Sequence, residues 1–298
     1  MSNKMVETIN RPKRSSPKIG QMKTIWKRLK KNKAAMVGGF FILLFLIVSF
    51  IGPDLTTQDP NKVQMINKLQ APSAEHWFGT DNYGRDIFTR IIHGMELTLK
   101  VGFFSVFIGG IIGVVLGIVS GYYGGRIDTI IMRVMDVLLA FPGILLALAI
   151  VSVLGGSLNN VIIAVAVFSI PAFARIVRGS TLSVRKLEYI DAMKALGASD
   201  FRIIFKHILP NVMSPIIVQA TLRIATAILT ASGLSFLGLG AQPPDPEWGA
   251  MLSEGRAFMA EHPHVILFPG IMIVIVVLAF NIFGDGLRDA LDPKMNRG

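Results

Sequence analysis

The 298-residue sequence contains no cysteine and little charge. Without cysteine, neither disulfide bonds nor thiolate metal sites hold the fold together. Asp, Glu, Lys and Arg make up 16% of the chain, whereas soluble globular domains contain about 25%. Hydrophobic residues make up 52%. This balance favours a membrane protein over a soluble domain.

The common nucleotide-binding and hydrolase motifs are also missing. The pattern G-x-x-x-x-G-K-[ST] does not occur, so the chain has no P-loop to hold ATP. H-E-x-x-H and G-x-S-x-G are absent as well, which excludes the metalloprotease and esterase signatures. We interpret the histidine-rich Glu261–His264 as a solvated loop. The sequence therefore predicts a chain that is not an enzyme, with no catalytic residue, metal site or cofactor of its own.

Long segments without charge are the strongest positive feature of the sequence. A membrane-spanning helix needs about 20 apolar residues, and the 38-residue run from Val137 to Ala174 is long enough for two. Its glycines and asparagines at Gly155–Asn160 favour a turn between them. We therefore predict an all-α integral membrane protein with six transmembrane helices, at residues 34–52, 98–124, 137–155, 159–177, 211–236 and 265–284.

Lys and Arg are distributed unevenly between the connecting segments. Residues 1–33 hold 11 Lys or Arg and one acid, and residues 175–206 hold seven Lys or Arg. Residues 54–96 hold four, with six acids. Because cytoplasmic segments are rich in Lys and Arg, we expect residues 1–33 to form a basic cytoplasmic tail and residues 34–298 a transmembrane domain with both termini cytoplasmic. A basic tail directly before a span is expected to touch anionic lipid rather than nucleic acid.

The stretch EYIDAMKALGASDFRIIFKHILPN, Glu188 to Asn211, interrupts this apolar pattern. Its periodicity predicts one short helix that ends at Gly197, a residue suited to a C-cap. Ser199 suits the N-cap of a second short helix, and Pro210 is expected to end that helix. The stretch thus predicts a module of two helices joined by a glycine turn.

Three interpretations of this module compete. A DNA-binding helix-turn-helix is disfavoured, because predicted membrane spans flank the module closely on both sides. A plain interfacial loop and a docking element for a cytoplasmic partner both stay open. Small residues allow close backbone approach, and large apolar ones act as anchors in a groove. The candidate docking residues are Asp191, Ala192, Ala195, Leu196, Gly197, Ala198 and Phe201.

Arg223 is the clearest charge inside a predicted span. A cation within a membrane helix is a candidate for a functional site, and we identify Arg223 as a candidate for lining a pathway. Structural pairing of Arg223 is the alternative. Ion-driven carriers usually contain buried Asp, Glu or His chains. The predicted spans show no such chain, which argues against a stand-alone carrier.

The module resembles the EAA loop of ABC-importer permeases, whose pattern is E-A-A-x3-G-x9-I-x-L-P. Asp191-Ala192-Met193 stands at E-A-A, Gly197 at the glycine and Leu209-Pro210 at L-P. The sequence departs from the pattern at Asp191, at Met193 and at His207, which stands in place of isoleucine. The loop would then cover residues 184–210.

Four further stretches are similar to the dipeptide/oligopeptide/nickel family of these permeases. They narrow the likeness to the subunit with a short N-terminal segment and a G-T-D-x-x-G-R-D external loop. Within that loop we expect Asp81 to N-cap a short helix containing Arg85 and Asp86. The four stretches are FGTDNYGRDIFTR (Phe78–Arg90), MRVMDVLLAFPGILLALAI (Met132–Ile150), LSFLGLGAQPPDPEWG (Leu234–Gly249) and GDGLRDALDPK (Gly284–Lys294).

The resemblance implies a type I ABC-importer permease fold in a bacterial cell membrane. It implies a homologous second permease that completes the pathway, and one or two cytoplasmic ATPase subunits that bind ATP and Mg and dock on the EAA loop. It also implies an extracytoplasmic binding protein that delivers the substrate. Dipeptides or oligopeptides are the expected substrate. Nickel, a metal chelate or glutathione is the first alternative, and a stand-alone secondary carrier is the second.

Overall fold

The computed structural model describes residues 24–291, and within this range every regular element is a helix. Five helices are long and apolar enough to cross a membrane, and a bent pair of helices, α4 and α5, makes a sixth crossing if it is counted as one span. The predicted all-α class with six spans is therefore confirmed. The five are α2 (Lys33–Leu55), α3 (Ile87–Tyr123), α6 (Leu158–Arg185), α9 (Leu209–Phe236) and α11 (His264–Leu291).

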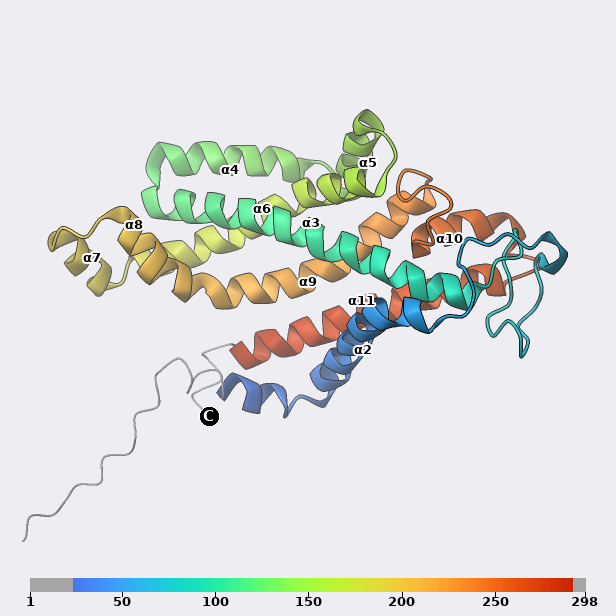
Figure 1. Ribbon diagram of the computed structural model, residues 1–298. Coiled ribbons are helices and arrows are strands. Elements are labelled where there is room, and N and C mark those ends of the chain that lie inside the picture. Colours follow the sequence, from blue (N-terminus) through green and yellow to red (C-terminus); the bar gives the residue numbers. More distant parts are fainter. Residues whose placement is uncertain (1–23, 292–298) are drawn as a thin grey trace, which may run out of the picture.

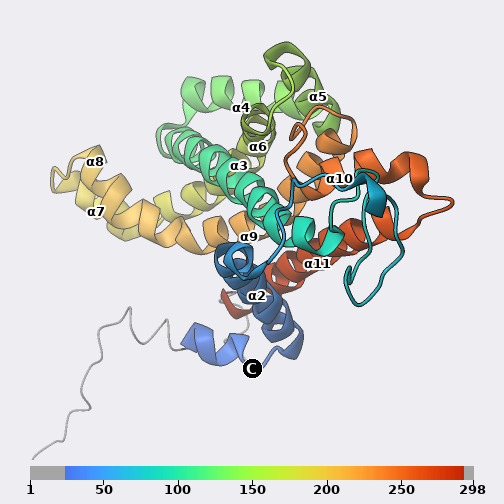
Figure 2. The same cartoon turned by 45° about the vertical axis from the view of Figure 1, so that its right-hand side comes forward.

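The long helices form an elongated bundle with a different cap at each end (Figures 1 and 2). The short helices α7 (Glu188–Ala195) and α8 (Asp200–Ile203) project from one end. The other end carries α10 (Trp248–Gly255), the 3₁₀ turns Met65–Asn67 and Arg256–Phe258, and the loop that precedes α3. Helix α3 packs along α6 and also contacts α9, while α2 packs on α11. Helix α3 is 37 residues long, which corresponds to about 55 Å, so it connects the two ends.

Close packing of α3 on α6 depends on glycines spaced four residues apart. A Cβ atom on Gly113 would lie 2.5 Å from Cβ of Phe173 and 2.7 Å from the carbonyl oxygen of Ile170. Similar overlaps at each of the four positions leave no room for a side chain. Small residues at this spacing let membrane helices approach closely. The glycines are Gly109, Gly113, Gly117 and Gly121.

The span predicted at residues 137–155, in which the sequence Phe141-Pro142 indicates a kink, is not one helix. Helix α4 (Gly125–Ala140) ends within this range, and α5 (Gly143–Leu154) continues from there at an angle of 91° to α4. Pro142 lacks an N–H and forces the preceding residue out of the helical region, and Phe141 has the extended backbone that follows from this. Helix α4 instead lies beside α6, where Oδ2 of Asp128 accepts a hydrogen bond of 2.6 Å from Nη2 of Arg178.

The predicted helix end at Pro210 is also wrong. The helix runs without a break from Asp200 to Phe236 through a π-turn at Ile204–Ile208. In that turn the N–H of Leu209 donates to the carbonyl of Ile204. A proline usually breaks a helix because it lacks an N–H, but here the widened turn directly before Pro210 shifts the hydrogen-bond register. The short helix α8 and the membrane helix α9 therefore form one continuous rod.

The predicted tail of residues 1–33 lies largely outside the described residues. Within residues 24–33, a helical turn covers residues 24–29. Leu29 is buried against Ala35 of α2 and Ala290 of α11. Asn32 caps α2 by accepting a hydrogen bond from the N–H of Ala35. The last part of this segment is therefore packed onto the bundle.

Candidate functional site

The two-helix module at one end of the bundle has both predicted caps. Helix α7 is followed by Gly197 in the left-handed region, with φ of +78°. Its N–H donates to the carbonyl of Lys194 at 2.9 Å, and the N–H of Ala198 donates to the carbonyl of Met193 at 3.0 Å. This pattern closes the helix end as in a Schellman motif. Oγ of Ser199 accepts from the N–H of Arg202 and caps α8.

The side chains that the sequence singled out gather on the outward surface of this module. Leu196 is 87% exposed and Phe201 is 69% exposed. The Phe201 ring lies 4.4 Å from that of Phe205, centre to centre, and forms an aromatic pair that also faces outward. Exposed large apolar groups in one place mark interaction sites. The other predicted docking residues are exposed or half-buried: Asp191, Ala192, Ala195, Gly197 and Ala198.

A different set of apolar residues fixes the module to the bundle. Ile190 of α7, Ile203 of α8 and Ile208 of the π-turn are fully buried. They pack in one cluster with the ends of α3 and α6 and with the start of α9. Ile190 and Leu196, whose spacing in the sequence suggests one helix face, therefore point in different directions: Ile190 into the bundle and Leu196 outward. The module is therefore anchored by buried isoleucines on one side and exposes apolar side chains on the other.

Tyr122, at the end of α3, joins both short helices to the bundle. Its hydroxyl donates to Oδ1 of Asp200 at 2.6 Å. The ammonium group of Lys194 lies 5.0 Å from the centre of the Tyr122 ring, within the range of a cation–π contact. Reasoning from the sequence missed this residue. Its position, where the apolar glycine-rich segment of α3 gives way to polar residues, could have indicated a contact at the membrane boundary.

Arg223 lies in the middle of α9 and is half-buried. Its guanidinium carbon is 6.0 Å from the centre of the Phe168 ring of α6. Among residues 24–291, Arg223 forms no ion pair. The geometry thus brings it next to an aromatic face, away from the docking residues at the end of the module.

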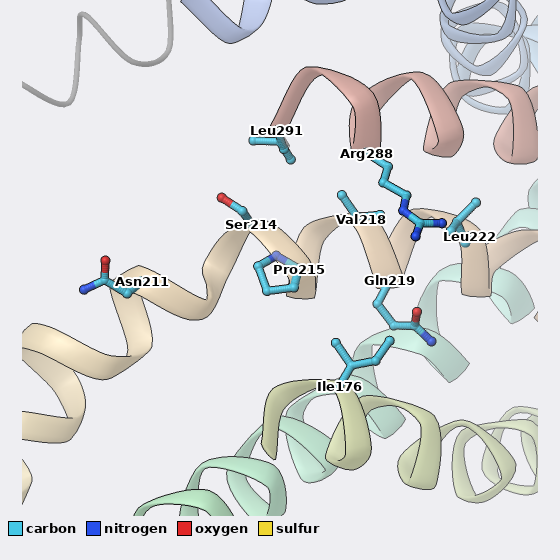
Figure 3. Close-up of a pocket in the computed structure, with 9 residues that line it drawn as sticks. All are labelled: Ile176, Asn211, Ser214, Pro215, Val218, Gln219, Leu222, Arg288 and Leu291. Atoms are coloured by element: carbon cyan, nitrogen blue, oxygen red, sulfur yellow. The ribbon is translucent and has the colours of Figure 1, made fainter. Parts of the chain in front are cut away.

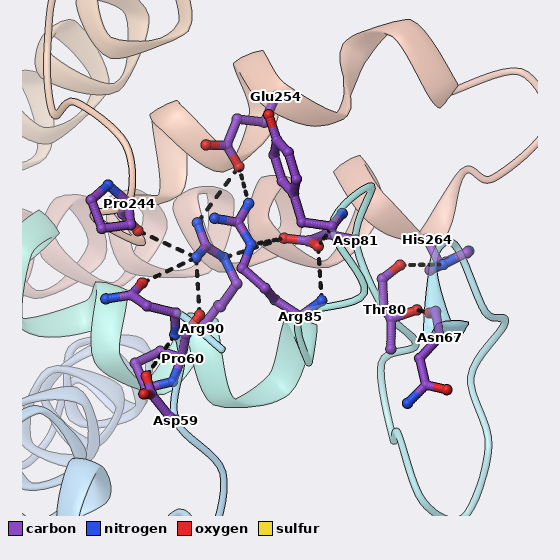
Figure 4. Close-up of polar contacts among 12 residues, drawn as sticks. Asp59, Pro60, Asn67, Thr80, Asp81, Arg85, Arg90, Pro244, Glu254 and His264 are labelled. Carbon is purple, nitrogen blue, oxygen red and sulfur yellow. Dashed lines mark hydrogen bonds and ion pairs between the residues drawn. The ribbon is translucent and has the colours of Figure 1, made fainter. Parts of the chain in front are cut away.

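The opposite end of the bundle holds a buried ion network (Figure 4). Nε of Arg85 donates to Oδ2 of Asp81 at 2.6 Å, and Nη2 of Arg85 donates to Oε2 of Glu254 in α10 at 2.5 Å. Nη1 of Arg90 donates to the carbonyl oxygens of Pro60 at 3.1 Å and Pro244 at 3.3 Å. Both arginines are less than 5% exposed. The network joins the loops before and after the membrane helices into one rigid platform.

The predicted cap by Asp81 is wrong. Helix α3 begins at Ile87, and Oδ2 of Asp86 caps it by accepting from the N–H of Thr89 at 2.8 Å. Asp81 instead holds the preceding turn by accepting from the N–H groups of Tyr83 and Arg85. Because an N-cap bonds to the N–H two or three residues ahead, Asp81 stands too early for this helix.

We expect the Arg85→Met variant to lower the midpoint of thermal unfolding of the purified protein markedly. The change removes the closest cation from the carboxylates of Asp81 and Glu254 and leaves them only Arg90, at 3.6 Å from each. Removing one partner from a buried ion pair costs about 3–5 kcal/mol. The matched control is Lys100→Met, because the ion pair of Lys100 with Glu96 is nearly half exposed and is worth at most about 1 kcal/mol. Equal unfolding midpoints for the two variants would contradict the network's stabilising role.

Comparison with known proteins gives two matching family models. The model described as binding-protein-dependent transport system inner membrane component matches residues 113–297. The N-terminal TM domain of oligopeptide transport permease C matches residues 20–72. Together they cover both the module and the N-terminal span.

Individual relatives are similar over almost their whole length. The dipeptide transport system permease protein DppC of Alkalihalophilus pseudofirmus is 54% identical over 93% of this chain and 91% of its own. The glutathione transport system permease protein GsiD of Pectobacterium atrosepticum is 51% identical over 91% of this chain and 90% of its own. Among solved structures, the inward-facing MetNI methionine ABC transporter matches with a TM-score of 0.56 and 21% identity, over 68% of this chain and 97% of the matched chain. The last comparison supports a shared fold.

Proposed function

Because the chain belongs to the family of binding-protein-dependent transport system inner membrane components, we propose that it is a permease subunit of an ABC importer for short peptides. It contributes one half of a translocation pathway, and a homologous second permease contributes the other half. A dipeptide and glutathione, the substrates in the names of the two relatives, are both short peptides. This shared chemistry favours a peptide over nickel.

The observation that carries this proposal is the rigid connection between the exposed module and α9. Leu196 and Phe201 stand on the surface while Ile190 and Ile203 anchor the same two helices. The π-turn continues α8 into the membrane helix without a break. A partner that binds the exposed side and moves would therefore move α9 as well. The chain lacks a P-loop, so the energy for such a movement has to come from an ATPase partner. The rigid connection lets that partner move α9.

We propose that the docking partner is a cytoplasmic ATPase subunit, which binds ATP and Mg and contacts Asp191, Ala192, Ala195, Leu196, Gly197, Ala198 and Phe201. The excess of Lys and Arg in residues 1–33 and 175–206 supports a cytoplasmic position for this end and for both termini. The platform around Arg85 then faces outward and is the surface on which a substrate-binding protein would dock. We propose that Arg223 lines the pathway.

Uptake measurements test the proposed function. In cells that lack this chain, we expect uptake of a radiolabelled dipeptide to be lost and to return with the wild-type gene. Unlabelled dipeptides, longer peptides, glutathione and nickel are then added as competitors. If nickel were the only competitor that lowered uptake, the chain would be assigned to metal import instead of peptide import. Uptake that persists without any ATPase subunit would favour a stand-alone carrier.

We expect Tyr122→Phe to lower the number of peptides imported per ATP hydrolysed by roughly tenfold or more, because loss of a hydrogen bond to a charged group costs about 1.5–3 kcal/mol. The ring and its contact with Lys194 remain, so the ATPase still docks, but α8 is held less firmly on α3. The control is Tyr123→Phe, one residue further on, where the side chain is 46% exposed. Parallel measurement of uptake and phosphate release in proteoliposomes gives the ratio, and an unchanged ratio for Tyr122→Phe would exclude this role.

A further inference from the structure

A cavity of about 470 Å³ lies between α6, α9 and α11, in the half of the bundle that carries the module. Figure 3 shows the side chains that line it, with Arg288 of α11 extending toward α9. Cavities of about 300–1,000 Å³ are the usual size for sites that hold small molecules. The cavity is therefore large enough for a short peptide.

Helix α9 presents a stripe of polar and apolar residues to this cavity. Asn211, Ser214, Val218 and Leu222 recur at spacings of three and four residues, so they share one face of the helix. The face is mixed in polarity, although it belongs to a helix apolar enough to cross a membrane. Polar side chains inside membrane segments normally face a bundle interior or a water-filled cavity. The stripe therefore indicates contact with water or a polar solute.

Two polar groups in the cavity have no partner among residues 24–291. Gln219 is only 9% exposed and its amide makes no hydrogen bond to a described residue. Arg288 stands at the exposed edge of the cavity, makes no ion pair to a described residue, and extends its guanidinium over Val218 and Leu222 (Figure 3). The amide of Gln219 can form a hydrogen bond with a peptide amide, and the guanidinium of Arg288 can pair with a peptide carboxylate.

We propose that this cavity is the cytoplasmic part of the peptide pathway, in which Arg288 pairs with the C-terminal carboxylate of the passing peptide and Gln219 bonds to its amide group. The inference rests on the proposed function and assigns a site within it. The lining helix is the same continuous rod that begins at Asp200. Movement of the docked module therefore opens or closes the cavity. When the cavity opens, the peptide is released to the cytoplasm.

The absence of cysteine makes a direct test possible, because a single introduced cysteine is the chain's only thiol. We compare Ser214→Cys and Gln219→Cys with the control Ile217→Cys on the same helix, which does not line the cavity. The assembled importer in inverted membrane vesicles is treated with a membrane-impermeant maleimide. Thiols in water ionise and react, whereas thiols in apolar surroundings are inert. We expect the two cavity positions to react roughly tenfold faster than Ile217→Cys, and millimolar dialanine to slow them.

A second measurement tests the role of Arg288. We expect Arg288→Met to lower the maximal rate of dialanine uptake by roughly tenfold, which corresponds to loss of one charge-assisted hydrogen bond. The half-saturating dialanine concentration stays constant because the binding protein sets it. Arg288→Lys keeps the charge and retains most of the rate. The ATPase still co-purifies with every variant.

The outcomes separate this site from the function on which it rests. If the wild-type importer carries dialanine but the cavity cysteines react as slowly as Ile217→Cys, or dialanine does not slow them, the site is refuted and the function stands. Wild-type rates of uptake by Arg288→Met would also refute it. If the wild-type importer hydrolyses ATP but carries no peptide, the proposed function fails and the site fails with it.

Discussion

We expect the Leu196→Glu variant to accumulate in the membrane at the wild-type level and to take up no peptide. Leu196 is 87% exposed, so a glutamate there disturbs no packing within the chain. In a complex, the same carboxylate would be buried in an apolar groove of the ATPase, and losing an apolar anchor of this kind costs at least about 2 kcal/mol. Co-purification of the ATPase with the tagged chain measures the loss directly.

The matched control for this variant is Ile66→Glu. Ile66 is 91% exposed, but it lies in the loop at the opposite end of the bundle. The chemical change is nearly the same, and we expect the ATPase to co-purify as with the wild type. If Leu196→Glu retained both its ATPase and its uptake, the docking assignment of the module would be wrong.

The second large effect is expected at the interface of α3 and α6. We expect Gly117→Leu to remove the folded protein from the membrane. A Cβ atom on Gly117 would lie 2.6 Å from the carbonyl oxygen of Ala174 and 2.8 Å from Cβ of Val177. Both neighbours belong to the helix α6, so the two backbones must separate. Overpacking by even a few atoms typically costs about 1–3 kcal/mol, and a leucine also opens the glycine contacts on either side.

Gly179→Leu is the matched control, because an added Cβ at Gly179 of α6 meets nothing within 4 Å. We expect this variant to accumulate like the wild type. The amount of protein in the membrane and its monodispersity in mild detergent are measured for both variants. A well-folded Gly117→Leu protein would show that α3 and α6 do not pack as closely as the structure describes.

The spans were predictable because most of them are long charge-free runs, and runs of this length are typical of membrane-spanning helices. Both caps of the module were predictable for a local reason, since Gly197 and Ser199 bond only to neighbours within five residues. The face of α7 was not predictable. With eight residues, this helix has only about two turns, and the burial of Ile190 depends on distant α3 and α6.

Contacts between distant segments account for most of what the sequence did not reveal. Arg85 and Glu254 are 169 positions apart, and no local pattern links them. The sharp bend at Pro142 was expected only as a kink, because its angle depends on how α4 packs against α6. The run of glycines from Gly109 to Gly121 was different, since its four-residue spacing is visible in the sequence and would have predicted the close helix pair.

The most direct test of coupling through the module is a site-specific cross-link from position 196. Leu196→Cys, the only cysteine in the chain, is joined to a short photoactivatable reagent in the assembled importer, and the adduct is identified by mass spectrometry. We expect an adduct with the ATPase subunit from position 196 and none from Ile66→Cys. An importer that transports peptide but yields no ATPase adduct from position 196 would contradict the claim that this module couples ATP hydrolysis to the membrane helices.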